Sequence, residues 1–165
     1  MSQTSIDEVR IRPGHPSDWQ RIAEFNTRLA WETEGKRLDP ATINSGVQNL
    51  LANDRHGRYF VAVAQSQIVG QMMHTREWSD WRNGEVWWLQ SVYVHQEFRR
   101  IGVFRKLYRH IEQMAEATPD VVGIRLYVER HNTKALDAYR ALGMDDAGYT
   151  IMERMFRGIP STTGQ

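Results

Sequence analysis

The sequence contains no cysteine among its 165 residues. This absence excludes a disulfide framework, a zinc site built on thiolates and an enzyme that works through an acyl-cysteine intermediate. Any chemistry at this chain must therefore use other side chains or the backbone.

Long apolar runs are also missing. No run approaches the roughly 20 residues that a membrane-spanning helix needs, and the polar start MSQTSIDE is unlike a signal peptide. We therefore expect a cytoplasmic protein that does not bind a membrane.

An excess of one charge is absent too, because the net charge is only +1 at pH 7. A value so small argues against a general binder of polyanions, and we expect no nucleic-acid partner. The six histidines lack the paired spacing of metal ligands, so we expect no metal. Basic residues nevertheless gather in one segment, which holds Arg99, Arg100, Arg105, Lys106 and Arg109.

The composition, 41% hydrophobic and 25% charged, is that of one globular domain. Alternating or short apolar runs predict strands, and runs with a period of 3.6 residues predict helices. We interpret Ser17 with Gln20 as a capping box, Asp39 as a helix cap, and residues 65–66 and 83–84 as turns. The predicted order is strand 9–12, helices 17–35 and 39–52, strands 58–64, 67–76 and 85–94, helix 103–118, strand 122–128, helix 132–142 and strand 149–156.

One segment between a buried strand and a helix start is both basic and glycine-containing. It comprises Arg99, Arg100, Ile101, Gly102, Val103 and Phe104. Free N–H groups at a helix start, with the positive end of the helix dipole behind them, suit a pyrophosphate, and glycine lets it approach the backbone. The alternative is an ordinary turn whose arginines are solvated.

These residues resemble the phosphate signature of the GNAT acetyltransferase superfamily, except that Phe104 replaces its usual small residue. A second stretch, NTKALDAYRALGM, resembles the other signature of that family through Asn132, Ala135 and Tyr139. Residues 77–84 (EWSDWRNG) and 87–94 (WWLQSVYV) are similar to a bacterial subgroup whose substrates are unknown to us. The resemblance implies a mixed α/β fold with a mostly antiparallel mixed sheet, a splayed strand pair and about four helices. We expect this domain at residues 8–157, between flexible tails at residues 1–7 and 158–165.

The resemblance further implies an enzyme that uses acetyl-CoA as co-substrate and transfers acetyl to an amine of a small molecule or peptide. Without cysteine, transfer is expected to be direct, through a ternary complex, unless another nucleophile serves. Tyr139 would protonate the departing thiolate, with a core aromatic as the alternative. The cofactor is expected to contact Val92, Tyr93, Val94, Arg99, Arg100, Ile101, Gly102, Val103, Phe104, Asn132, Ala135 and Tyr139.

The general base is harder to assign, because Gln90 and Ser91 stand where related enzymes commonly carry carboxylates. We rank Glu129 first as the base, ahead of Glu32, Glu34 and Glu77, although each also fits a solvated surface carboxylate. Aromatic and acidic residues suit a cationic amine, so we expect acceptor contacts from Glu32, Glu34, Trp78 and Trp88.

Two other functions stay open on the sequence. The missing strand carboxylate also fits a noncatalytic acyl-CoA sensor of the same fold, and the basic segment fits weak nucleic-acid binding. The sequence does not decide whether the chain forms a homodimer.

Overall fold

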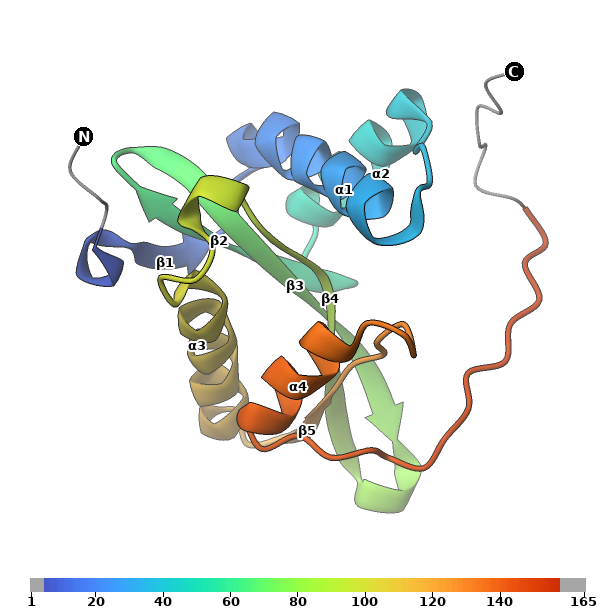
Figure 1. Ribbon diagram of the computed structural model, residues 1–165. Coiled ribbons are helices and arrows are strands. Elements are labelled where there is room, and N and C mark those ends of the chain that lie inside the picture. Colours follow the sequence, from blue (N-terminus) through green and yellow to red (C-terminus); the bar gives the residue numbers. More distant parts are fainter. Residues whose placement is uncertain (1–4, 158–165) are drawn as a thin grey trace. The chain divides into compact units, whose positions relative to one another are not determined.

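The computed structural model describes residues 5–157. These residues form two compact units, residues 5–125 and residues 126–157, and each unit is described here by itself. Figure 1 labels the elements of both units. Within the described residues, no helix has both the length and the apolar character needed to cross a membrane.

Five strands of the first unit form one sheet in the order β1-β2-β3-β4-β5. Neighbouring strands run antiparallel, except that β4 and β5 are parallel. The strands are β1 (Arg10–Pro13), β2 (Gly57–Ala64), β3 (Gln67–Ser79), β4 (Gly84–Val94) and β5 (Val121–Arg125). The α-helices of this unit are α1 (Trp19–Glu34), α2 (Pro40–Ala52) and α3 (Val103–Ala117), and its 3-10 turns are η1 (Ile6–Glu8), η2 (Pro16–Asp18), η3 (Asp80–Arg82) and η4 (Gln96–Phe98).

Helices cover both faces of this sheet (Figure 1). On the α1 face, which α1 and α2 cover, Ile22, Val47 and Met73 belong to one buried apolar cluster. On the α3 face, a Cβ added to Gly70 would meet Val103 and Leu107 of α3. Because strand side chains alternate, odd-numbered residues of β3 from Gln71 onward lie on the α1 face and even-numbered residues from Gly70 onward on the α3 face.

The predicted turns are confirmed. Gln65 and Ser66 join β2 to β3 with φ angles of +48° and +63°, the left-handed pair that a two-residue hairpin turn of type I′ requires. Asn83, with φ of +48°, ends η3 directly before β4.

The predicted start of the first helix is wrong in its cap. Ser17 lies in η2, and the N-cap of α1 is Asp18, whose side chain makes no capping hydrogen bond to α1 but accepts from the preceding His15 N–H at 2.7 Å. Asp18 also pairs with Arg12 of β1 at 2.7 Å. The sequence did not predict this ion pair, because its two residues belong to different elements and follow no helical spacing. The cap of α2 is confirmed, since the Thr42 N–H donates to Asp39 at 2.8 Å.

The splayed strand pair is present, although β5 is shorter than the predicted strand at residues 122–128. β5 pairs with β4 from Glu85–Val121 to Trp88–Arg125, and no further. β4 itself continues to Val94, so the last part of β4 does not pair with β5.

The second unit holds α4 (Thr133–Ala141), preceded by Asn132 as its N-cap. The strand predicted at residues 149–156 is wrong, because these residues form neither helix nor strand. An alternating pattern becomes a strand only when a neighbouring strand supplies hydrogen bonds, and residues 126–157 contain no other strand. With α4, the described residues contain the four helices of the predicted fold class.

The predicted domain bounds, residues 8–157, stay a prediction. Of the tail predicted at residues 1–7, residues 1–4 lie outside the described part, and Ile6 and Asp7 belong to η1. The tail predicted at residues 158–165 also lies outside it.

One buried titratable side chain affects the stability of the sheet. His74 of β3 is 1% exposed on the α3 face, stacked on Trp87 with ring centroids 3.9 Å apart and on Phe60 at 6.1 Å. Burial, with repulsion from Arg76 and Arg58, lowers the pKa of His74 to about 4. The fold therefore keeps this ring neutral where an unfolded chain would protonate it.

Mild acid should consequently destabilise the wild type more than a His74→Phe variant. The unfolded chain protonates His74 near pH 6.5 and the folded chain near pH 4. The contribution of the neutral ring to the free energy of unfolding is therefore full above pH 6.5 and is lost as the pH falls from 6.5 to 4. Between these two pH values the unfolding free energy of the wild type should fall by about 3 kcal/mol more than that of the variant. Urea unfolding at a series of pH values measures the difference, and parallel curves would contradict the assignment.

Candidate functional site

The site begins at an irregularity in β4. Between the pairs Gln71–Tyr93 and Met73–Gln90 the register shifts, so Ser91 and Val92 together oppose a single residue of β3. Ser91 has a φ of +52°. This is a β-bulge, and the left-handed conformation of a non-glycine residue costs about 1–2 kcal/mol. The surrounding structure must therefore hold the bulge in place.

Beyond the bulge, one edge of β4 is open. The His95 N–H donates to the Val69 carbonyl at 2.8 Å, so the backbone groups of His95 face β3. Because these groups alternate along a strand, those of Val94 and Val92 point away from β3. β5 ends its pairing at Trp88, and within residues 5–125 no strand pairs with this edge. A peptide-like ligand could therefore add to it as a strand would.

The chain then enters the basic turn. After η4, Arg100 and Gly102 both have positive φ angles, +70° and +99°, and Gly102 is the N-cap of α3 without a side-chain hydrogen bond to the cap. The first backbone N–H groups of a helix have no partner inside the helix. Arg99, Arg100 and Arg105 are exposed around them. This turn therefore offers a positive site to an anion such as a pyrophosphate.

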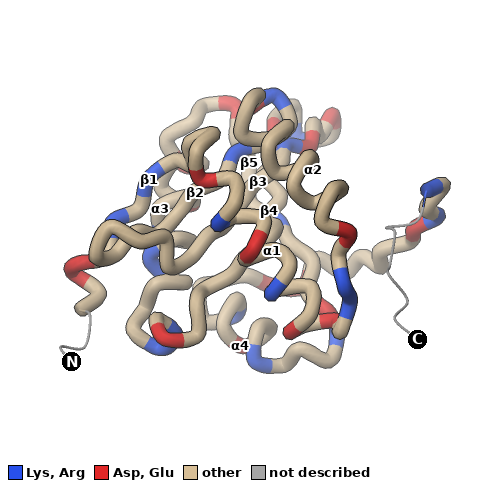
Figure 2. The backbone as a smooth tube through the Cα atoms, turned by 90° about the horizontal axis from the view of Figure 1, so that it is seen from above, with Lys and Arg blue, Asp and Glu red and all other residues tan. Residues whose placement is uncertain are grey.

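Not every basic residue of the segment serves the turn. The Lys106 ammonium donates to the Ile6 and Val9 carbonyls, at 3.1 and 2.6 Å, and so ties the start of the first unit to α3. Arg109 pairs with Glu112. Figure 2 shows that Lys and Arg positions are interleaved with Asp and Glu positions along the chain.

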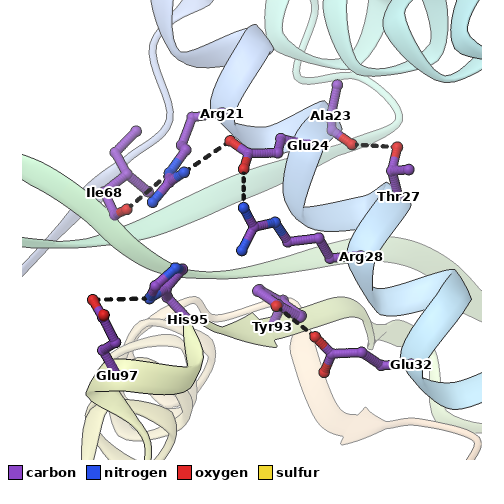
Figure 3. Close-up of polar contacts among 10 residues, drawn as sticks. All are labelled: Arg21, Ala23, Glu24, Thr27, Arg28, Glu32, Ile68, Tyr93, His95 and Glu97. Atoms are coloured by element: carbon purple, nitrogen blue, oxygen red, sulfur yellow. Dashed lines mark hydrogen bonds and ion pairs between the residues drawn. The ribbon is translucent and has the colours of Figure 1, made fainter.

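Arg99 links the open edge to α1. Its Nε donates to the Val94 carbonyl at 2.8 Å, and its Nη2 donates to Glu32 at 2.7 Å. The other oxygen of Glu32 accepts from the Tyr93 hydroxyl at 2.8 Å (Figure 3). Burial raises the pKa of Glu32, but the hydrogen bonds from Arg99 and Tyr93 outweigh it and the net shift is downward. Glu32 is thus a firmly ionised partner of the turn.

Of the predicted acceptor contacts, Trp88 is the most enclosed. The Trp88 indole N–H donates to Glu77 at 2.5 Å, and Arg125 donates to the same carboxylate at 3.3 Å. The Arg125 guanidinium lies 5.6 Å from the centroid of the Trp88 ring. Glu77, Trp88 and Arg125 come from three adjacent strands on the α1 face.

The other predicted acceptor contacts lie apart from Trp88. Trp78 follows Glu77 in β3 and therefore lies on the opposite face of the sheet, 61% exposed. Glu34, in the last turn of α1, pairs with Lys36 at 2.5 Å on the surface. The structure therefore does not bring Trp78 and Trp88 together.

The remaining predicted site residues belong to the second unit. The Asn132 side chain accepts from the Ala135 N–H at 3.2 Å, as an N-cap does. Tyr139 lies four residues after Ala135 and so shares its face of α4. Glu129 is exposed and accepts from the His131 N–H at 2.8 Å. Among residues 5–157, no three His, Asp or Glu side chains gather as metal ligands.

Three residues near the bulge were missed by the sequence predictions. Asn26 of α1, Tyr59 of β2 and Gln71 of β3 are all buried and lie around Ser91. The sequence contained a signal for them. Asn26 lies one helical turn after Ile22 on the apolar face of α1, and Gln71 lies two residues before Met73, on the same face of β3. A polar residue at a core position is the pattern that would have found them.

Comparisons with known proteins find solved structures that are similar to this chain. The crystal structure of a possible acetyltransferase from Clostridium difficile 630 is 42% identical, covers 91% of this chain and 99% of that chain, and has a TM-score of 0.86. A predicted acetyltransferase from Clostridium acetobutylicum, solved with acetyl-CoA, shares the fold at 15% identity, with 88% and 96% of the chains covered and a TM-score of 0.74.

The sequence likeness to a characterised enzyme is more limited. The thialysine N-epsilon-acetyltransferase of Bos taurus is 29% identical over 79 residues, which are 48% of this chain and 45% of the bovine protein. The chain thus spans less than half of that relative. The Acetyltransferase (GNAT) family, by contrast, matches residues 17–144. Because this match spans most of the sequence and both signature stretches, the chain belongs to the acetyltransferase (GNAT) family.

Proposed function

We propose that this chain is an N-acetyltransferase that moves the acetyl group of acetyl-CoA directly to an amine of a small molecule or peptide. The observation that carries the proposal is the continuity of the open β4 edge with the basic turn at the start of α3. In coenzyme A the amide-containing pantetheine arm is joined to a pyrophosphate, so one extended ligand matches both parts. The family match points to the same cofactor.

In the proposed complex the pyrophosphate binds the backbone N–H groups of Gly102, Val103 and Phe104, with Arg100 beside them. The pantetheine amides pair with the backbone of Val92 and Val94. Arg99 donates a hydrogen bond to the Val94 carbonyl, and a pantetheine amide that pairs with this carbonyl would replace it. The Arg99–Glu32 pair is 40% exposed on each side, and such a pair contributes at most about 1 kcal/mol. The exchange is therefore within reach of cofactor binding.

The proposed reaction has one covalent step. The amine nitrogen attacks the thioester carbonyl carbon, the carbon–sulfur bond breaks, and coenzyme A leaves as a thiolate that takes a proton from Tyr139. The Val92 N–H polarises the carbonyl oxygen on which negative charge develops. The lack of a cysteine to hold the acetyl group supports direct transfer in a ternary complex.

For the base we propose Glu129. Glu32 is a poorer base because its pKa lies below the usual value. Glu77 already accepts from Trp88 and Arg125. On β4, the amide of Gln90 donates to Thr75 at 2.7 Å, and an amide has no basic oxygen to offer. Among the described residues, the Glu129 carboxylate accepts a hydrogen bond from the His131 N–H through one oxygen, which leaves its other oxygen for a proton.

For the acceptor we propose a cationic amine. Trp88 and Glu32 both lie on the α1 face, where an aromatic surface and a carboxylate suit such a group. Glu34, near the end of the helix that carries Glu32, is proposed as a further contact to this amine. Trp78 lies on the other face of the sheet, which weighs against its predicted role.

Binding and turnover test the proposal in sequence. Acetyl-CoA at about one hundred times its dissociation constant should stabilise the fold by about 2.7 kcal/mol and raise the melting temperature by roughly 5–10 °C. Release of coenzyme A in the presence of pooled amines then reports transfer. No thermal shift at millimolar acetyl-CoA would refute the cofactor, and a shift without release from any amine would favour the noncatalytic sensor.

Gly102 should be a position where charge matters more than size. Its φ of +99° strains any side chain, and a Cβ there would lie 3.6 Å from Ile6 without a clash. Gly102→Ala and Gly102→Asp share this strain, but only the aspartate brings negative charge to the pyrophosphate. We expect calorimetry to show acetyl-CoA affinity at least roughly tenfold weaker for the aspartate variant than for the alanine variant. Equal affinities would place the phosphates elsewhere.

Tyr139→Phe separates the acid role from a packing role, because it removes one hydroxyl and keeps the ring. With chemistry limiting, turnover should fall by roughly ten to ten-thousandfold, while acetyl-CoA affinity and melting temperature stay close to wild type. Stopped-flow single-turnover measurements exclude a masking effect of product release. Wild-type rates across the pH range would assign Tyr139 to packing alone.

A further inference from the structure

A buried polar cluster lies around the β4 bulge, and no part of the proposed reaction uses it. Three of its members are side chains from three different elements: Asn26 of α1, 7% exposed, Tyr59 of β2, 4% exposed, and Gln71 of β3, 0% exposed. We call these three residues the Ser91 clamp. Polar side chains buried this deeply are normally retained only when they satisfy one another or a specific partner.

The specific partner is Ser91. Gln71 Nε2 donates to the Ser91 backbone carbonyl at 3.2 Å and to Asn26 Oδ1 at 3.0 Å. Asn26 Nδ2 donates to the Tyr59 hydroxyl at 2.9 Å, and the Ser91 side chain is close enough to that hydroxyl to affect the pKa of Tyr59. The geometry thus links Tyr59, Asn26 and Gln71 in one chain of hydrogen bonds that ends on the Ser91 backbone carbonyl.

Ser91 is the strained residue of the bulge, with φ of +52°. Its peptide carbonyl is bonded to the nitrogen of Val92, so the direction of the Ser91 carbonyl fixes the direction of the Val92 N–H. The Ser91 carbonyl points to Gln71, and the Val92 N–H of the same trans peptide points in the opposite direction. A clamp on the carbonyl is thus a clamp on the amide that faces the open edge.

We infer that Asn26, Tyr59 and Gln71 are positioning residues for acyl transfer, which aim the Val92 N–H at the thioester carbonyl by holding the Ser91–Val92 peptide. This inference rests on the proposed function. None of the three touches the cofactor, and their effect passes through Ser91. Gln71 is the central member because it alone contacts both the Ser91 backbone and Asn26.

The plain alternative is that the cluster only braces the core, so the test needs a variant that weakens the core without touching Ser91. Tyr59→Phe and Gln71→Met remove clamp hydrogen bonds and keep apolar volume. Val47→Ala is the matched control, because Val47 is 2% exposed in the same apolar cluster as Tyr59. All three are first compared at a temperature where each is fully folded.

The decisive readout compares two ligands by calorimetry: acetyl-CoA, and S-ethyl-CoA, which has the same chain length but no thioester carbonyl. Wild type should prefer acetyl-CoA by about three- to tenfold, as for one hydrogen bond. In Tyr59→Phe and Gln71→Met this preference should disappear, with S-ethyl-CoA affinity changed less than twofold. Val47→Ala should keep the preference.

Turnover gives the second readout. The clamp variants should lower kcat at least roughly tenfold with little change in the KM of the amine, whereas Val47→Ala should leave kcat near wild type. An equal loss of affinity for both ligands, or an equal loss of kcat in Val47→Ala, would overturn the inference and leave the cluster a core brace.

The design also separates this inference from the proposed function. If no amine is acetylated by wild type but the clamp variants still abolish the preference for acetyl-CoA, the enzyme proposal fails and the clamp stands. If wild type binds neither ligand, amide chemical shifts decide: unchanged Ser91 and Val92 resonances in Gln71→Met overturn the clamp, and displaced resonances confined to the bulge support it.

Discussion

One extra residue in β4 sets the geometry of the candidate site. The bulge at Ser91 shifts the register against β3, and it falls where β4 has already lost its pairing with β5 at Trp88. The first effect turns a peptide plane, and the second leaves the edge beside that plane open. Together they leave the Val92 N–H on an edge of β4 with which no strand of residues 5–125 pairs.

The electrostatics of the site follow from that open edge. The Val94 carbonyl faces away from β3, and the nearby Arg99 side chain takes it. The same guanidinium then reaches Glu32 at the end of α1, where the Tyr93 hydroxyl completes the carboxylate's partners. A helix that covers the sheet is thereby coupled to the turn that precedes α3. Ligand groups arriving at either end must compete with this chain of contacts.

Local patterns predicted the elements, and they failed where distant residues decide. The turns at Gln65 and Asn83, the Asp39 cap and the start of α3 after Gly102 all follow from a few neighbouring residues, and all are present. The Asp18 side chain pairs with Arg12 of another element and does not cap α1, and a strand at residues 149–156 would depend on a partner that an alternating pattern cannot supply. At the candidate site, the basic turn was predictable from the residue types of one short segment. The members of the Ser91 clamp stand out in the sequence only as polar residues at core positions, and their pairing was not predictable because their hydrogen bonds join residues 20 to 45 positions apart.

Those separations bear on when the site forms as the chain folds. Helices and hairpins close short loops, whereas the clamp needs α1, β2, β3 and β4 to meet before its hydrogen bonds can offset the strain at Ser91. A compact intermediate with its secondary structure in place but its core loosely packed would still have a relaxed β4. The orientation of the Val92 N–H is therefore a product of completed tertiary packing, and partially folded chains that retain helices and hairpins lack it.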